Sequence, residues 1–162
     1  MAGSVSEGLS SLLGGEDKNI LSTGNSEIDK KIADGIPLGS LTLIEGENDT
    51  GKSVLTQQIM WGAMKQGLRV DLYSTELTAK SFLSQMESMS LDVSDYFAWG
   101  YIRLFHLHMV GFKWTKEEMD GILQRIVNHI RQSKAEVAVI DSLTMFTEYT
   151  EQSSILSFLT NC

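Results

Sequence analysis

Hydrophobic and polar positions follow two different rhythms along this chain. Four segments of strand length are rich in apolar residues, namely 41–44, 69–74, 101–106 and 137–140. Apolar residues recur instead at helical spacing over 52–66, 79–89 and 115–132. Short apolar runs are typical of buried parallel strands, and helical spacing is typical of helices that cover a sheet. The order strand, helix, strand, helix therefore predicts an α/β fold with a mostly parallel central sheet and helices on both faces.

The most regular helix is predicted over residues 115–132. It opens with the sequence TKEE, in which Thr115 and Glu118 can form a capping box. An apolar stripe follows at Met119, Ile122, Ile126 and Ile130. These two signals predict both where the helix begins and which of its faces is buried.

The chain has the length of one ordinary domain. Its 162 residues contain no apolar run of the roughly 20 residues that a membrane-spanning helix needs. Residues 1–19 are rich in Gly and Ser and lack the pattern of a secretory signal, so we expect a flexible leader. Residues 20–162 then form the folded domain. It begins with a short helix over 22–33, which Asn25 or Ser26 can cap.

The net charge indicates which class of partner to expect, and the cysteine content indicates the cellular compartment. The chain has 13 Lys and Arg residues against 21 Asp and Glu residues, a formal net charge of −8. Proteins that bind duplex DNA usually carry clustered basic side chains, so nucleic acid is not the expected partner. Cys162 is the only cysteine and cannot form an internal disulfide. That is typical of proteins in a reducing cytoplasm.

A glycine-rich loop supplies the strongest chemical signal. It matches G-x-x-x-x-G-K-[ST] through Gly46, Glu47, Asn48, Asp49, Thr50, Gly51, Lys52 and Ser53, and Val54 follows in the next helix. Glycines let such a loop wrap around phosphates, and the start of the following helix adds its dipole. Lys52 can reach the β- and γ-phosphates, and the Ser53 hydroxyl can bind Mg²⁺. The loop lies between a predicted strand and a predicted helix, as this chemistry requires.

Two carboxylates are candidates for the rest of a nucleotide site. Asp141 ends the apolar run VAVI, as the acid of a Walker B strand does, and would hold Mg²⁺ through a water or by orienting Ser53. Glu76 follows the strand RVDLYS at the edge of the sheet where ligands bind, and could orient and deprotonate an attacking water. Alternatively, Glu76 merely supports the first turn of the next helix, capped by Ser74 or Thr75.

His106 and His108 are two residues apart near the end of a predicted strand. Two isolated histidines in such a place are more often packing or surface groups than metal ligands. We therefore do not expect them to bind a metal.

Five segments resemble the RecA/KaiC-like ATPases and, within them, the H-component accessory ATPases of the archaellum, the archaeal flagellum. In order they are STGNSEID, GIPLGS, GENDTGKS, STEL and AVIDSLT, and the resemblance extends over residues 20–148. It implies a RecA-like P-loop fold. It also implies that Gly46 to Ser53 form the phosphate loop, that Asp141 is the Mg²⁺ acid, and that Glu76 is the candidate catalytic base.

The resemblance also implies cofactors and partners. Members of this family bind ATP and Mg²⁺ and form homo-oligomers, often hexamers, with nucleotide near the subunit interfaces. The archaellum branch implies a cytoplasmic protein peripheral to the cell membrane. Its expected partners are the archaellum assembly ATPase, a ring-forming scaffold protein and a membrane platform protein.

Two departures from the family pattern bear on function. KaiC-type members that hydrolyse ATP often have two adjacent acids where this chain has Thr75-Glu76, so we expect weak or absent turnover. A further strand of the family inserts between the Walker A and Walker B strands, but only about 20 residues follow Asp141 here. We therefore expect the C-terminal strands of the domain to be missing from this sequence.

Three functions follow from these observations. The first is an ATP-binding regulatory component of the archaellum motor, whose nucleotide state controls oligomerisation or docking to partners. The second is an active oligomeric RecA-like ATPase. The third is a recombinase-like DNA-binding ATPase, which the acidic balance of the chain opposes.

Overall fold

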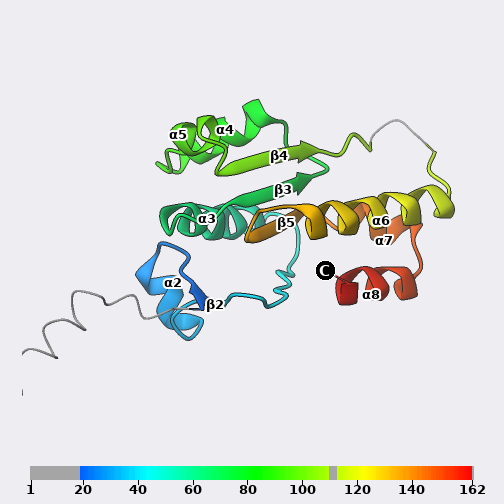
Figure 1. The fold of residues 1–162 in the computed structure, drawn as a ribbon, viewed down its shortest axis with the longest axis horizontal. Coiled ribbons are helices and arrows are strands. Elements are labelled where there is room, and N and C mark those ends of the chain that lie inside the picture. Colours follow the sequence, from blue (N-terminus) through cyan, green and yellow to red (C-terminus); the bar gives the residue numbers. More distant parts are fainter. Residues whose placement is uncertain (1–18, 110–112, 162) are drawn as a thin grey trace, which may run out of the picture.

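The computed structural model describes residues 19–109 and 113–161 of this α/β protein. Its elements are shown in Figure 1 and are, in order, β1 (Ile20–Leu21), α2 (Ser26–Lys31), β2 (Ile36–Pro37), α3 (Lys52–Lys65), β3 (Val70–Ser74), α4 (Ala79–Ser88), α5 (Ser94–Ala98), β4 (Ile102–His106), α6 (Lys116–Gln132), β5 (Val137–Asp141), α7 (Thr144–Tyr149) and α8 (Gln152–Asn161). The leader predicted over residues 1–19 lies outside the described residues except for Asn19.

A three-stranded parallel sheet forms the centre of the fold, with the order β4-β3-β5. Its register places Ser74 of β3 opposite His106 of β4 and Asp141 of β5. All five residues of β3 are buried, because this strand has a neighbour on each side and helices on each face. The predicted parallel sheet is confirmed for these three strands.

The two faces of the sheet are covered by different helices. Val70 and Leu72 of β3 belong to a buried cluster that includes residues of α3 and α4. Tyr73 points to the opposite face and belongs to a second cluster with residues of α6, α7 and α8. Because successive side chains of a strand alternate between faces, one short strand supplies both clusters. The prediction of helices on both faces is therefore confirmed.

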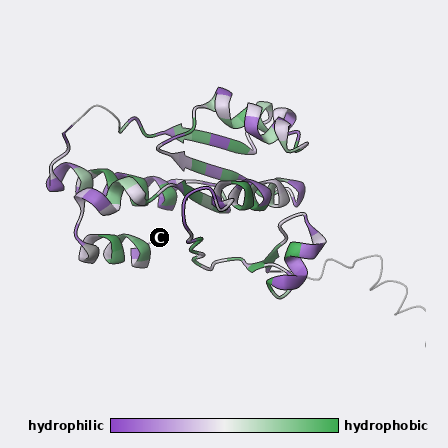
Figure 2. Ribbon diagram, turned by 180° about the vertical axis from the view of Figure 1, so that it is seen from behind, coloured by the Kyte–Doolittle hydropathy of each residue, from purple (hydrophilic) through white to green (hydrophobic). Residues whose placement is uncertain are grey.

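Helix α6 begins where the sequence predicts. Thr115 and Glu118 form the capping box, in which the Glu118 N–H donates to Thr115 Oγ1 at 3.3 Å and the Thr115 N–H donates to Glu118 Oε2 at 2.9 Å. The buried residues of α6 are Met119, Leu123, Ile126 and Val127. The bands of green and purple along α6 in Figure 2 reflect this periodicity. None of the described helices is long and apolar enough to cross a membrane.

Residues 20–38 form an N-terminal arm made of β1, α2 and β2. The predicted cap is confirmed, because Asn25 accepts hydrogen bonds from the N–H groups of Glu27 and Ile28. The arm packs on α3 at Gly62, where an added Cβ would lie only 2.0 Å from the Ser22 carbonyl oxygen. The short antiparallel pairing of β1 with β2 was not predicted from the sequence.

The strand predicted over Leu41–Ile44 is wrong for this structure. Residues 41–47 have no regular secondary structure, and in Figure 1 the chain between β2 and α3 runs below the three strands. Leu41 and Leu43 are 62% and 67% exposed. A strand needs a hydrogen-bonding neighbour, and no described segment pairs with residues 41–44. The apolar pattern alone therefore does not produce a strand here.

Candidate nucleotide-binding site

The glycine-rich loop at residues 46–53 leads directly into α3. Gly51 is the N-cap of α3 with φ +86°, and Asp49 has φ +62°, two conformations in the left-handed region that glycine adopts freely and aspartate tolerates. A Cβ added to Gly46 would lie 2.8 Å from Thr50 Oγ1, so glycine permits the close turn. The first N–H groups of α3 have no partner within the helix and are directed toward the loop, as phosphate binding requires.

Lys52 lies against the loop that it belongs to. Its Nζ donates hydrogen bonds to the carbonyl oxygens of Gly46 at 2.9 Å and Glu47 at 2.6 Å. Thr50 Oγ1 closes the same turn by donating to the Glu47 carbonyl at 2.8 Å. The Lys52 ammonium is therefore held against the loop by its carbonyl groups. Val54, the last residue predicted in this set, is 55% exposed on the first turn of α3.

Asp141 connects the loop with the sheet. Burial raises the pKa of its carboxyl and the charge of Glu76 raises it further, whereas a hydrogen bond from Ser53 and the charge of Lys52 act in the opposite direction. The net result is a pKa above the ordinary value of aspartate. Three residues that the sequence predicts for the same site, Lys52, Ser53 and Glu76, thus lie close enough to Asp141 to affect its pKa.

Glu76 is exposed just beyond the end of β3. The Ser142 hydroxyl donates to Glu76 Oε1 at 3.4 Å, which joins the candidate base to the residue after Asp141. The alternative role of Glu76 in the first turn of α4 is not supported, because α4 begins at Ala79 with Thr78 as its N-cap. Ser74 does act locally, but within a turn that precedes the helix.

The residues present fit a Mg²⁺–nucleotide complex. The charge of Glu76 contributes to the raised pKa of Asp141, and a bound divalent cation would favour the charged form of Asp141. The described residues contain no cluster of three or more His, Cys, Asp or Glu side chains that could hold a metal alone. Mg²⁺ commonly binds through one carboxylate, waters and substrate phosphates, and Ser53 with Asp141 would complete such a set.

Sequence reasoning missed the groups that hold the two acids together. The Thr75 N–H donates to the Asp141 carbonyl at 3.1 Å, and the Ser142 N–H donates to Thr75 Oγ1 at 3.4 Å. Thr75 is 6% exposed. These contacts carry the pairing of β3 and β5 one residue beyond the strands. The only sequence signal for these contacts was that Thr75 is adjacent to Glu76 and Ser142 is adjacent to Asp141.

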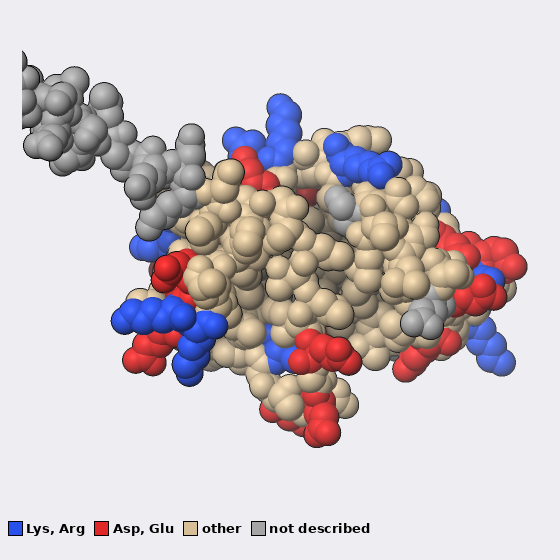
Figure 3. All heavy atoms as spheres, turned by 90° about the horizontal axis from the view of Figure 1, so that it is seen from below, with Lys and Arg blue, Asp and Glu red and all other residues tan. Residues whose placement is uncertain are grey.

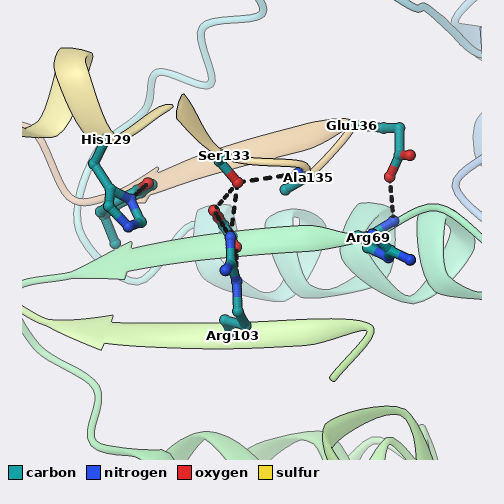
Figure 4. A network of polar contacts seen from close by, with 8 residues as sticks. Arg69, Arg103, His129, Ser133, Ala135 and Glu136 are labelled. Carbon is teal, nitrogen blue, oxygen red and sulfur yellow. Dashed lines mark hydrogen bonds and ion pairs between the residues drawn. The ribbon is translucent and has the colours of Figure 1, made fainter. Parts of the chain in front are cut away.

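A polar network fixes the strand from which Glu76 emerges. Arg103 of β4 donates hydrogen bonds of 2.8 and 2.7 Å to the two carboxylate oxygens of Asp71 of β3, and Figure 4 shows its side chain extending from β4 across β3 toward Ser133. Ser133, at the end of α6, donates to Asp71 Oδ2 at 2.6 Å. Asp71 is 1% exposed, and a buried carboxylate is tolerated only when it is paired in this way. The network links β3, β4 and the end of α6 by hydrogen bonds.

Comparison with known proteins identifies the family. The family model described as "ATPase: KaiC" matches residues 21–160. This chain belongs to the KaiC ATPase family. The three-stranded parallel sheet with helices on both faces is accordingly the core of a RecA-like fold, as the sequence predicts.

Named relatives of this KaiC-family chain come from archaea. The archaeal flagellar ATP-binding protein FlaH of Sulfolobus acidocaldarius is 34% identical over 140 residues, which covers 86% of this chain and 61% of that protein. FlaH of Methanocaldococcus jannaschii is 32% identical over 118 residues, covering 73% of this chain and 50% of the relative. The chain therefore spans only half to three-fifths of the length of these relatives.

A solved structure supports the same relationship. The flagellar accessory protein FlaH from Methanocaldococcus jannaschii superposes on this structure with a TM-score of 0.72 at 26% sequence identity. The superposition covers 86% of this chain and 64% of the crystal structure's chain. The resemblance to the H-component accessory ATPases of the archaellum, noted from the sequence, is confirmed by these relatives.

Proposed function

We propose that this chain is an ATP-binding component of the archaellum motor, in which the bound nucleotide, with weak or absent hydrolysis, controls oligomerisation or docking to motor partners. The observation that supports it most is the position of Asp141, which Ser53, Lys52 and Glu76 all approach closely enough to affect its pKa. The relatives named as archaeal flagellar ATP-binding proteins agree with this proposal.

Each residue has a proposed role in holding the nucleotide. Gly46 to Ser53 bind the phosphates through backbone N–H groups, and Lys52 exchanges its two carbonyl partners for phosphate oxygens. Ser53 and Asp141 would hold Mg²⁺, which would supply positive charge to stabilise the phosphates. Glu76 accepts a proton from the attacking water if turnover occurs. A single carboxylate at this position is the reason that we propose slow turnover.

The proposed setting is the cytoplasmic side of the cell membrane. Its partners there are further copies of the same protein, in a ring such as a hexamer, together with the archaellum assembly ATPase, a ring-forming scaffold protein and a membrane platform protein. The exposed Leu41, Leu43 and Val54, which lie in the sequence on either side of the phosphate loop, support a subunit contact close to the nucleotide.

Nucleic acid is a less suitable partner. The net charge of the chain is −8. On the face that Figure 3 shows, Lys and Arg side chains lie scattered toward the rim among Asp and Glu, around a mostly uncharged centre. A recombinase-like function would need a continuous basic surface. We therefore retain one alternative, an active oligomeric ATPase, which the contact of Glu76 with Ser142 favours.

The test is the affinity of the full-length protein for Mg²⁺–ATP, measured by calorimetry. Lys52→Ala should weaken binding by at least about tenfold, because charge-assisted hydrogen bonds to phosphate contribute about 1.5–3 kcal/mol. Lys65→Ala is the matched control, since it removes a lysine from the other end of α3 and should leave affinity unchanged. A folded protein that binds no nucleotide would overturn the proposal. Rapid single-turnover cleavage that Glu76→Gln abolishes would establish the alternative.

A further inference from the structure

The last residues of the three parallel strands form one row across the sheet. His106 of β4 and Asp141 of β5 both lie opposite Ser74 of β3. The ladder continues past this row, because the Leu107 N–H donates to the Ser74 carbonyl at 2.7 Å. Residues opposite one another in register share a face of the sheet. His106, Ser74 and Asp141 are therefore neighbours at the edge where the candidate site is built.

The turn that carries Glu76 starts from the middle of this row. Ser74 is fully buried, and its Oγ accepts hydrogen bonds from the N–H groups of Glu76 at 3.2 Å and Leu77 at 2.8 Å. A serine that binds the two backbone donors after it forms a compact local turn. Leu77 is 8% exposed and is anchored in the core cluster that α3 and α4 cover. Ser74 thus holds the N–H groups of Glu76 and of the residue after it.

His106 contacts the same turn at the carbonyl group of Leu77. Its Nδ1 lies 3.0 Å from the Leu77 carbonyl oxygen. A carbonyl oxygen only accepts hydrogen bonds, so Nδ1 carries the proton and donates it to this bond, and Nε2 is left directed away from the turn. The imidazole of His106 is itself exposed, which means that it is not part of the core. The bond to Leu77 therefore depends on Nδ1, and burial of the ring does not hold His106 in place.

We infer that His106 is a positioning residue for Glu76. Its bond to the Leu77 carbonyl holds the backbone that follows Glu76, in addition to the Glu76 and Leu77 N–H groups that Ser74 holds, and together these bonds direct the carboxylate toward Ser142 and Asp141. The inference rests on the proposed function in one respect, since it assigns Glu76 to the cleavage of bound ATP. His106 belongs neither to the phosphate loop nor to the acids at the strand ends. It affects the rate of ATP cleavage and not the affinity for the nucleotide.

The experiment exploits the two ring nitrogens of histidine. His106→Asn places an amide N–H near the position of Nδ1, whereas His106→Gln places it near Nε2, which cannot reach the Leu77 carbonyl. We expect single-turnover cleavage of saturating Mg²⁺–ATP to fall about tenfold in His106→Gln and to recover most of the wild-type rate in His106→Asn. The affinity for Mg²⁺–ATP should stay within about twofold of wild type in both variants, because neither touches the phosphate loop.

His108→Gln is the matched control, because His108 is exposed and has no described hydrogen bond to the turn, although its ring lies 5.8 Å from the ring of His106. Its cleavage rate should equal that of the wild type. Equal rates in the Asn and Gln variants, or a parallel loss of affinity and rate, would overturn the inference. Tight binding without any cleavage by the wild type would also overturn it, while leaving the proposed nucleotide-sensing function standing. Loss of binding in the folded wild type would overturn the proposed function itself.

Discussion

The candidate site has two halves that are built in different ways. The acid half, Glu76 and Asp141, stands at the ends of β3 and β5, and every residue of β3 is buried. The phosphate half, residues 46–53, follows a coil in which Leu41 and Leu43 are more than half exposed. One half is therefore positioned by the packed sheet, whereas the other is positioned by α3 and by the conformation of its own backbone.

This difference indicates which half can respond to a nucleotide. The acid half is held by bonds between strands, such as the Thr75 N–H to the Asp141 carbonyl. The phosphate half is held largely by bonds within itself, from Lys52 and Thr50 to the carbonyls of Gly46 and Glu47. A ligand that replaces bonds within a loop changes that loop first. We expect nucleotide binding to reorganise the phosphate half around a fixed acid half.

The largest contrast should come from truncating one leucine in the strand that leads to Glu76 and one leucine in the coil that precedes the phosphate half. Leu72→Ala truncates a fully buried residue of β3 and should lower the free energy of unfolding by about 2–5 kcal/mol. Leu43→Ala truncates a residue that is 67% exposed and should cost less than about 0.5 kcal/mol. Urea unfolding of both variants measures the difference. Equal costs would mean that residues 41–44 are buried in solution, for example against another subunit.

A smaller loss of stability is expected from substituting two glycines that have similar backbone conformations. Gly51 has φ +86° and Gly67 has φ +79°, and a Cβ added to either would meet no atom within 4 Å. Each Gly→Ala substitution should therefore cost about 1–2 kcal/mol through backbone strain alone. Only Gly51→Ala should also weaken Mg²⁺–ATP binding, because Gly67 follows the far end of α3. Thermal unfolding and calorimetry of the pair separate strain from function; a loss of affinity in both would contradict this assignment.

The smallest effect concerns the arm, which packs on α3 at Gly62, away from the phosphate half. Partial burial would raise the pKa of the Asp29 carboxyl, but hydrogen bonds from Ser22 and from the hydroxyl and N–H of Thr23 outweigh it and leave this pKa lowered. A lowered carboxyl pKa stabilises the folded state above the ordinary aspartate pKa, and the contribution disappears as the pH falls through the lowered value.

Asp29→Asn should therefore be less stable than the wild type near neutral pH, and the two should converge in acid. Urea unfolding across the range from about pH 7 to about pH 3 measures this convergence. A stability difference that stays constant at every pH would show that the Asp29 charge is not what holds the arm.

Elements whose hydrogen bonds are internal were predicted well from the sequence. The capping box of Thr115 and Glu118 and the Asn25 cap are both found where the sequence places them. A helix satisfies its backbone locally, so the signals for it lie within a few residues. The helices α5, α7 and α8 were not predicted; α5 and α7 are only five and six residues long. The run VAVID forms β5 because β3 pairs with it, whereas the similar run at 41–44 has no partner among the described residues.

What the sequence determined by itself is the chemistry available to the site. The spacing of Gly46, Gly51, Lys52 and Ser53 predicts a phosphate loop, since the conformation and donors of such a loop come from consecutive residues. Tertiary structure alone decided that Glu76, Asp141 and Ser53 meet, and that Ser142 and His106 contact the turn that holds Glu76. Those contacts join residues that are far apart in the sequence and belong to different elements or loops. Their geometry depends on register and on which strands find a neighbour, and no local pattern contains that information.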